Sequence, residues 1–344
     1  MKIILVIFLL FNTLLARSDC LQQAVLDQLG RSIRPERDTF VVSPSGHFYV
    51  HFDTTDNHAP DLSDLDSNGI PDYIDKVRIF ADSAYYMLTV NMDYNTEPAD
   101  DDGIYDIYIK YFSPGQYGFN WSEGNGISYL EIGNNYYGYN SPATPDQLLQ
   151  ISLSHEYFHA IQRGYKPNYA PNDQYFLEMS SMWFEDVIVP DGNDYLDGWA
   201  DPLLEDPTAD FDDTGPGYEL ALFGHYLSSF IDLDGVNDAK ESNIMRYIWD
   251  DYASTTNYPL ALTSLRNILN GIDYPLFIEC WVDFMSRNLY NGMYEDMENE
   301  FYYYIDQELI NPINTAPQIL NNNLSLSLFL DNKSASILSY RNFH

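Results

Sequence analysis

The sequence predicts an α+β fold in which a sheet comes first along the chain and helices follow. Two observations indicate this order. Short segments rich in tyrosine and isoleucine, bounded by Gly, Asn and Pro, occur in the first part of the chain and are typical of strands. From Thr144 onward, apolar residues recur with helical spacing. With 344 residues, the chain can bury a substantial core.

Residues 1–18 have the pattern of a secretory signal peptide. Lys2 precedes an apolar run from 3 to 15, and small residues stand at 16 and 18, where a signal peptidase would cleave after Ser18. The run is too short to span a bilayer comfortably, and no later segment approaches the required length. We therefore expect a secreted protein, extracellular or periplasmic, with no membrane span after cleavage.

The predicted strands come in chain order. Residues 39–53 alternate apolar and polar side chains around Phe48, Val50 and Phe52, which predicts one half-buried strand. The segments "GIYDIYIKYF" (103–112) and "GISYLEIG" (126–133) are predicted to be two further strands of the same sheet. After the first strand and before residue 103, the chain has an aspartate-rich segment and then a predicted helix that ends at about Thr89.

The helical part begins with a strong start signal. Thr144 is a predicted N-cap, Pro145 suits the first helical position, and Gln147 completes a capping box, so a helix is predicted from 145 to 163 with Gly164 as its stop. A connection rich in Pro and Asp is predicted at about 189–216, and a β-rich tail at 313–344. Further helices are predicted at about 173–187, 218–231, 238–252, 259–269 and 274–289.

Composition excludes some partners. The chain has 16 Lys and Arg against 52 Asp and Glu, a formal net charge of -36. Such a surface repels nucleic acid and anionic lipid, so neither is expected as a partner. Cys20 and Cys280 are a candidate disulfide pair in an oxidising compartment.

His155, Glu156 and His159 form an HExxH motif on the first predicted helix. Residues four apart project from the same helix face, so both imidazoles can bind one metal ion. Zinc lowers the pKa of its bound water to about 7, and Glu156 is placed to accept a proton from that metal-bound water. The alternative is that both histidines are hydrogen-bonded packing residues, because such a motif also arises by chance.

A third protein ligand is needed, because catalytic zinc commonly has three. The metzincin pattern HExxHxxGxxH requires a glycine and a histidine where this chain has Gln162 and Tyr165, which excludes that class. Glu178, however, follows His159 after 18 intervening residues, on the next predicted helix.

The segments "HEYFHAIQ" and "FLEMSSMWFED", with that gap, resemble the gluzincin metallopeptidases. They are most similar to the thermolysin/aminopeptidase-like peptidase MA group and to secreted bacterial metalloproteases related to it. The resemblance implies one catalytic domain over 19–312, with a mixed-sheet subdomain, active-site helices and a helical C-terminal subdomain. It also implies zinc held by His155, His159 and Glu178, with Glu156 as general base. Glu185 and Asp186 are alternatives as third ligand, and otherwise would orient a histidine.

An oxyanion stabiliser is also needed. "GYELALFGHYL" is similar to the tyrosine-bearing helix of aminopeptidase-like gluzincins, which assigns this role to Tyr218, although Leu220 and Ala221 depart from the family pattern. His225 is the competing donor, and ordinary packing is the alternative for Tyr218. The family's substrate-pairing edge strand would be "GISYLEIG". Because its exopeptidase motif is missing there, the resemblance favours an endopeptidase.

The segment "DLDSNGIPDYID" (64–75) has the spacing of an EF-hand-like calcium loop. Gly69 stands at the turn, and Asp instead of Glu occupies position 12. A solvated acidic turn is the alternative here, and it is favoured at Asp100–Asp102, a second candidate. The predicted calcium ligands are Asp64, Asp66, Asn68, the Ile70 carbonyl, Asp72 and Asp75.

The sequence therefore predicts a secreted, calcium-stabilised zinc metallopeptidase that hydrolyses peptide or protein substrates. Two alternatives stay open at this point. One is a catalytically inactive, calcium-stabilised surface or adhesive protein on a peptidase scaffold. The other is a zinc hydrolase acting on a non-peptide amide or ester.

Overall fold

The computed structural model describes residues 34–113, 115–207, 211, 216–235, 238–254, 261–271, 274–292, 302–313, 329–330 and 335–336. The chain divides into two compact units: residues up to 171 with 184–194, and residues 172–183 with 195 onward. Helix α5 (Gln174–Ile188) contributes residues to both. The fold is mixed α and β, as predicted. Across the described part of the chain, we find no helix with the length and apolar character required for a membrane span.

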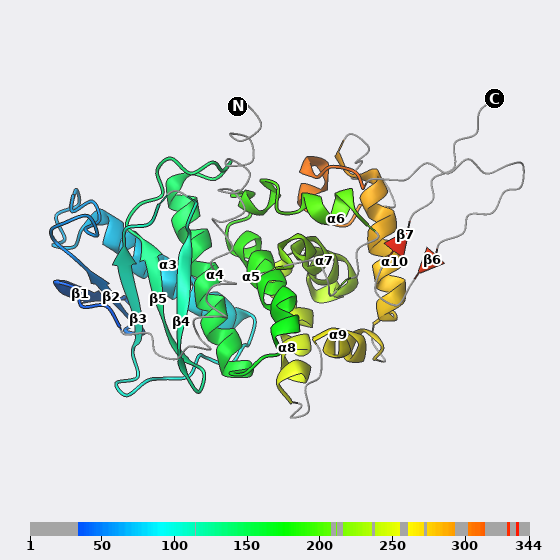
Figure 1. Cartoon of the computed structure of the whole chain (residues 1–344), viewed down its shortest axis with the longest axis horizontal. Helices are drawn as coiled ribbons and strands as arrows, with labels where there is room; N and C mark the ends of the chain where they lie inside the picture. The colour runs from blue at the N-terminus through cyan, green and yellow to red at the C-terminus, as the bar shows by residue number, and fades with distance from the viewer. Residues whose placement is uncertain are drawn as a thin grey trace, which may run out of the picture. The chain divides into compact units, whose positions relative to one another are not determined.

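The first unit is built on a five-stranded mixed sheet with strand order β1-β2-β3-β5-β4 (Figure 1). The three central strands run parallel, and each edge strand pairs antiparallel with its neighbour. The strands are β1 (Thr39–Val42), β2 (Phe48–Phe52), β3 (Tyr105–Lys110), β4 (Gly118–Gly124) and β5 (Ile127–Gly133).

Helices α3 (Asp72–Tyr86) and α4 (Pro145–Tyr165) pack on one face of this sheet. Alternate residues of β2 face them, and Phe48 is fully buried. The Phe48 ring lies 6.3 Å from that of Tyr85 in α3 and 5.2 Å from that of Tyr157 in α4, centroid to centroid. The strand alternation predicted from sequence thus forms the core between the sheet and these helices.

Residues 39–53 form a hairpin, so the prediction of a single strand there is wrong. The Ser43 amide donates to the Phe48 carbonyl, and Gly46 has a φ of 81°. This left-handed conformation is cheap for glycine and closes the turn between β1 and β2. The alternation belongs to β2 alone, and the single-strand prediction passed over the turn residues at 43–46, which include Pro44 and Gly46.

The predicted substrate-pairing edge strand is also corrected. The segment at 126–133 does form a strand, β5, but it lies between β3 and β4 and is paired on both sides. Six of its seven residues are buried, as expected for an interior strand. The edge strand beside α4 is β4, which the sequence analysis did not identify as a strand.

The opposite face of the sheet carries a charge cluster around Arg34. Its guanidinium forms ion pairs with Asp100, Asp106 and Glu123, and Asp106 also bonds the Nε2 of His51 at 2.6 Å. The hydrogen bond with Glu123 is the main cause that raises the pKa of Arg34 above its usual range. Asp100, which belongs to the acidic cluster interpreted above as a solvated turn, is thus an ion-pair partner of Arg34.

Helix α4 begins as predicted. The Thr144 hydroxyl accepts a hydrogen bond from the Gln147 amide at 3.3 Å, and the Gln147 side chain accepts one from the Thr144 amide at 2.9 Å. This capping box satisfies two amide groups that otherwise have no partner inside the helix. The helix continues past Gly164 to Tyr165, so its predicted end is two residues too early.

The second unit is helical. Phe223 lies at its centre, with its ring centroid 5.3 Å from those of Trp281 and Phe284. The predicted helices occur close to their predicted bounds, and a short 3-10 turn (Tyr218–Leu220) precedes α7. Helix α6 lies inside the stretch predicted as a connection. The helices are α6 (Asp201–Glu205), α7 (Ala221–Tyr226), α8 (Ile244–Ser254), α9 (Ala261–Leu269) and α10 (Phe277–Arg287).

Three predictions concern the ends of the chain. The signal peptide and Cys20 lie outside the described residues. Cys280 is a buried free thiol in α10, and burial raises its pKa to about 12. In the tail, β6 (Phe329–Leu330) and β7 (Ala335–Ser336) form an antiparallel pair inside the stretch predicted to be β-rich.

Candidate metal centre

Helix α4 carries His155, Glu156 and His159 at buried positions, with 6%, 4% and 8% of their surface exposed. The helical repeat places the two imidazoles one turn apart on the same face, as predicted. Their Nε2 atoms are 3.1 Å apart and face each other. The motif therefore places two potential metal-ligand nitrogens beside each other.

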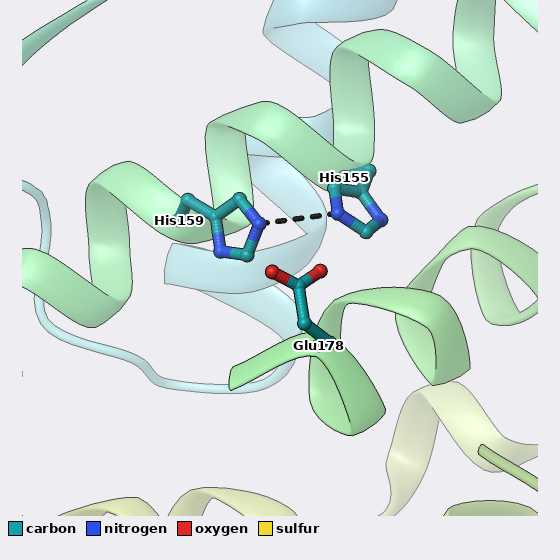
Figure 2. A group of neighbouring side chains, drawn as sticks. All are labelled: His155, His159 and Glu178. Atoms are coloured by element: carbon teal, nitrogen blue, oxygen red, sulfur yellow. Dashed lines mark hydrogen bonds between the residues drawn. The ribbon is translucent and has the colours of Figure 1, made fainter. Parts of the chain in front are cut away.

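Glu178 in α5 completes a group of three potential ligands. One nitrogen of each histidine and one carboxylate oxygen of Glu178 all lie within 4.8 Å of one another. Figure 2 shows the Glu178 carboxylate directed toward both imidazole rings. Glu178 is 2% exposed, so its carboxylate is buried like the two histidines. The structure thus brings together the three residues that the gluzincin resemblance assigned to zinc.

Each histidine is oriented through its other ring nitrogen. The Nδ1 of His155 lies 2.6 Å from Oε1 of Glu185, and the Nδ1 of His159 lies 2.8 Å from Oε1 of Gln162. Both oxygens can accept, so the tautomer with its proton on Nδ1 satisfies both contacts. In that tautomer each Nε2 presents a lone pair to the shared point between the rings.

This arrangement fits a zinc ion. Two lone pairs 3.1 Å apart beside a carboxylate repel one another unless a cation or proton lies among them. In a tetrahedral site, two nitrogens about 2.0–2.1 Å from zinc are about 3.3 Å apart, close to the separation found here. His, His and Glu with a position left for water is also a donor set of catalytic zinc.

The rival ligands on α5 have other positions. Glu185 is committed to His155, which is the orienting role that the sequence analysis preferred for it. Asp186 is buried but is not a member of the three-residue group. Gln162 was not predicted as a site residue. Its position three residues after His159, on the same helix face, was the available signal.

Tyr218 and His225 both lie in the second unit. Gly217, which precedes Tyr218, has a φ of 86° and packs so closely on Tyr175 that an added Cβ would lie 2.5 Å from the Tyr175 carbonyl oxygen. Tyr175 is one helical turn before Glu178, so the backbone at Gly217 is fixed against the start of α5. Tyr218 itself is 4% exposed.

His225 is a buried residue of α7 that packs against an aromatic ring. It is 1% exposed and stacks on the Tyr304 ring at a centroid distance of 4.1 Å. Burial lowers the pKa of His225 to about 3, so its imidazole is neutral at physiological pH. Beside Tyr218, the sequence analysis overlooked Glu219, which is 6% exposed; burial raises its pKa to about 7.

The aspartate loop has the backbone expected of a calcium loop. Gly69 at the sixth position has a φ of 88°, and α3 begins at Asp72, the ninth position. The Asp64 carboxylate accepts hydrogen bonds from the Asn68 and Gly69 amides at 3.1 and 2.8 Å. These turns curl the chain around the side chains of the first half of the loop.

The loop's carboxylates converge in part. Ligand oxygens of Asp64, Asp66 and Asp72 lie within 4.8 Å of one another, as a calcium site requires. Asp75, the predicted ligand at position 12, lies instead 2.6 Å from Nε of Arg78 and accepts from the Asn68 side chain at 2.6 Å. Backbone hydrogen bonds, first that from Gly69, lower the pKa of Asp64.

No known protein family matches the sequence, and no curated protein is significantly similar to it.

Proposed function

We propose that this protein is a secreted zinc-dependent metallopeptidase of gluzincin type, acting as an endopeptidase. One observation carries the proposal. The Nε2 atoms of His155 and His159 and the carboxylate of Glu178 meet at one buried point, while Glu185 and Gln162 hold the far side of each imidazole. Packing histidines do not need two lone pairs aimed at each other, whereas a cation site does.

His155, His159 and Glu178 would hold the zinc ion. When bound, zinc supplies a nucleophilic water near neutral pH and polarises the substrate carbonyl. Glu156 would take the proton of the attacking water on its carboxylate and deliver it to the leaving amine nitrogen. Burial of Glu156 keeps bulk water from competing for that proton.

Tyr218 is the better candidate for the oxyanion. Its phenol can donate a hydrogen bond to the carbonyl oxygen as negative charge develops there. The fixed backbone of Gly217 against Tyr175 supports this assignment, because a transition-state donor must be held in place before the reaction. His225 is engaged in a stack with Tyr304 and is neutral.

The aspartate loop would bind calcium as a structural ion. Asp64, Asp66 and Asp72 would supply carboxylate oxygens, with Asn68 and the Ile70 carbonyl as further ligands. The loop leads directly into α3, which packs on α4. A bound ion would therefore stabilise the helix that supports the zinc-binding helix.

The mechanism is tested with Glu156→Gln in the mature protein. The amide cannot accept the proton, so hydrolysis of a peptide library should fall by about 10²- to 10⁴-fold. Zinc content, measured by atomic emission after dialysis, should stay at one per chain. His159→Ala should lose both zinc and activity.

Glu131→Gln is the matched control for Glu156→Gln. Glu131 is also a buried glutamate of the first unit, but it bonds Lys110 and Trp121 on the sheet. The Glu131→Gln variant should retain both its zinc and its rate of hydrolysis. A Glu156→Gln protein that cleaves as fast as wild type would exclude this mechanism. Zinc binding with cleavage of esters or small amides but no peptides would exclude the peptidase assignment alone.

A further inference from the structure

We propose that Gly118 is a positioning residue for the general base: the missing side chain at this point of β4 provides the space that the Glu156 side chain occupies. The inference rests on the proposed function, since it concerns how Glu156 is aimed at its water. It adds a residue of the sheet edge to a site otherwise built from α4 and α5.

The contact is direct. A Cβ placed on Gly118 would lie 2.9 Å from Cγ of Glu156, closer than carbon atoms approach in folded proteins, and 3.2 Å from the Glu131 carbonyl oxygen. Glu156 is 4% exposed, so its side chain has little room to retreat. Any larger residue at 118 must therefore displace the Glu156 side chain or the strand.

Backbone conformation does not explain this glycine. Gly118 has no positive φ, whereas Gly124 at the other end of the same strand has a φ of 91°. A φ outside the left-handed region does not by itself call for glycine. Space is thus the requirement at this position. Glu156 Cγ is the atom nearest to the added Cβ, and the Glu131 carbonyl oxygen and Ile132 Cδ1 follow at 3.2 Å each.

Two tyrosine hydroxyls fix the chain just before Gly118. Tyr136 donates to the Tyr117 carbonyl at 2.6 Å and accepts from the Gly133 amide at 3.3 Å, while Tyr139 donates to the Gln116 carbonyl at 2.6 Å. Burial raises the pKa of Tyr136 well above its usual range, so its hydroxyl stays a donor. Residues 116 and 117 cannot move away without breaking these bonds.

A second anchor lies just after Gly118. The Asn120 side chain donates to the Glu156 carbonyl at 3.3 Å and accepts from Nε of Arg163 at 2.5 Å. These bonds join the strand to α4 at Glu156 itself and two turns further along. Because β4 is held on both sides of residue 118, it forms a rigid wall against which the Glu156 side chain rests.

The wall affects chemistry because proton transfer needs its acceptor in place. A misplacement of about 1 Å can cost about a hundredfold in rate. Gly118→Ala should therefore lower kcat by about 10- to 100-fold while leaving KM and zinc content near wild type. Gly192→Ala is the matched control, because its added Cβ would lie equally close, 2.9 Å, to another α4 side chain, Ile151. That variant should keep wild-type kcat.

A double-mutant cycle distinguishes positioning from general damage. If residue 118 acts through Glu156, adding Gly118→Ala to Glu156→Gln should cause no further loss of kcat. Additive losses would overturn the inference. Should Gly118→Ala fail to fold, Tyr136→Phe tests the same wall, and its loss of kcat should likewise vanish in the Glu156→Gln background.

A readout without catalysis uses the metal-free protein. In a sample labelled with ¹³C-glutamate, the Glu156 Cγ resonance is assigned by its disappearance in Glu156→Gln. Gly118→Ala should shift this resonance, and Gly192→Ala should not. An unshifted resonance together with wild-type kcat overturns the role of Gly118. Wild-type protein that binds zinc without any hydrolysis, with the shift still present, would instead contradict the proposed function and leave the contact established.

Discussion

The zinc-type group and the aspartate loop are both clusters of potential metal ligands, yet they are built differently. In the first, side chains outside the group hold the ligands: Glu185 bonds His155 and Gln162 bonds His159, each at the nitrogen turned away from the shared point. In the loop, the ligand oxygens themselves accept hydrogen bonds, as when both Asp64 oxygens accept backbone amides.

The two clusters also differ in burial. His155, His159 and Glu178 are all buried, whereas Asp66 is exposed and Asp64 and Asp72 are partly exposed. The polar atoms of a buried site are not solvated by water, so a bound cation stabilises them more than it stabilises the atoms of an exposed loop. An exposed loop can be satisfied by water and by its own amides. The proposed zinc site would therefore be organised before binding, and the loop is expected to gain order on binding.

The largest effect is expected from breaking the orientation of the zinc group. Glu185→Ala removes the acceptor of the His155 Nδ1 proton without removing any ligand. Loss of such an orienting carboxylate typically costs about 10- to 100-fold in metal affinity. Competition with a chromophoric zinc chelator would measure it. Glu131→Ala serves as control, since it also removes a buried glutamate. Equal zinc affinity in both variants would contradict the orienting role.

The calcium loop should respond in stability and not in zinc affinity. At free calcium ten times its Kd, binding adds about 1.4 kcal/mol to the free energy of unfolding, a shift of a few degrees in Tm. Asp64→Asn should abolish this calcium-dependent shift. Asp61→Asn should retain it, because Asp61 lies outside the loop although it makes a similar turn with Ser63. A calcium shift that survives Asp64→Asn would exclude the assignment.

The smallest effect concerns pH without calcium. The Gly69 amide is the main cause that lowers the pKa of Asp64 below its ordinary 3.8. The ionised carboxylate is therefore favoured in the folded loop, and its stabilisation is present above pH 3.8 and lost as pH falls through the lower folded-state value. In EDTA, the Tm difference between wild type and Asp64→Asn should shrink below pH 3.8. A constant difference over that range would show that Asp64 does not contribute through its charge.

Local signals explain which parts of the fold were predictable. Thr144 and Gln147 cap α4 through neighbours three residues apart, so sequence alone located the start of the helix. Strand pairing depends on residues far away in the chain. "GFNWSEG" contains two glycines and weak alternation, so β4 was missed, and β5 was taken for an edge although it is covered by β4.

The same distinction applies to the site. His155, Glu156 and His159 share a helix face and were found from their spacing, and Glu178 came from the resemblance to gluzincins. Gly118 could not be found, because its role depends on a contact between a strand and a helix 38 residues away in sequence. Glycines are common, and a missing side chain gives no pattern in one sequence.

The capping box of α4 also determines the direction in which the site residues of this helix point around its axis. Thr144 and Gln147 fix where the helix starts, and every later residue then points in a direction set by about 100° per residue. One residue inserted between Gln147 and His155 would leave the cap intact yet rotate both imidazoles and Glu156 by about 100° around the helix axis. The distance from cap to motif is therefore itself a functional parameter, one that tolerates substitution of side chains far better than a change of length.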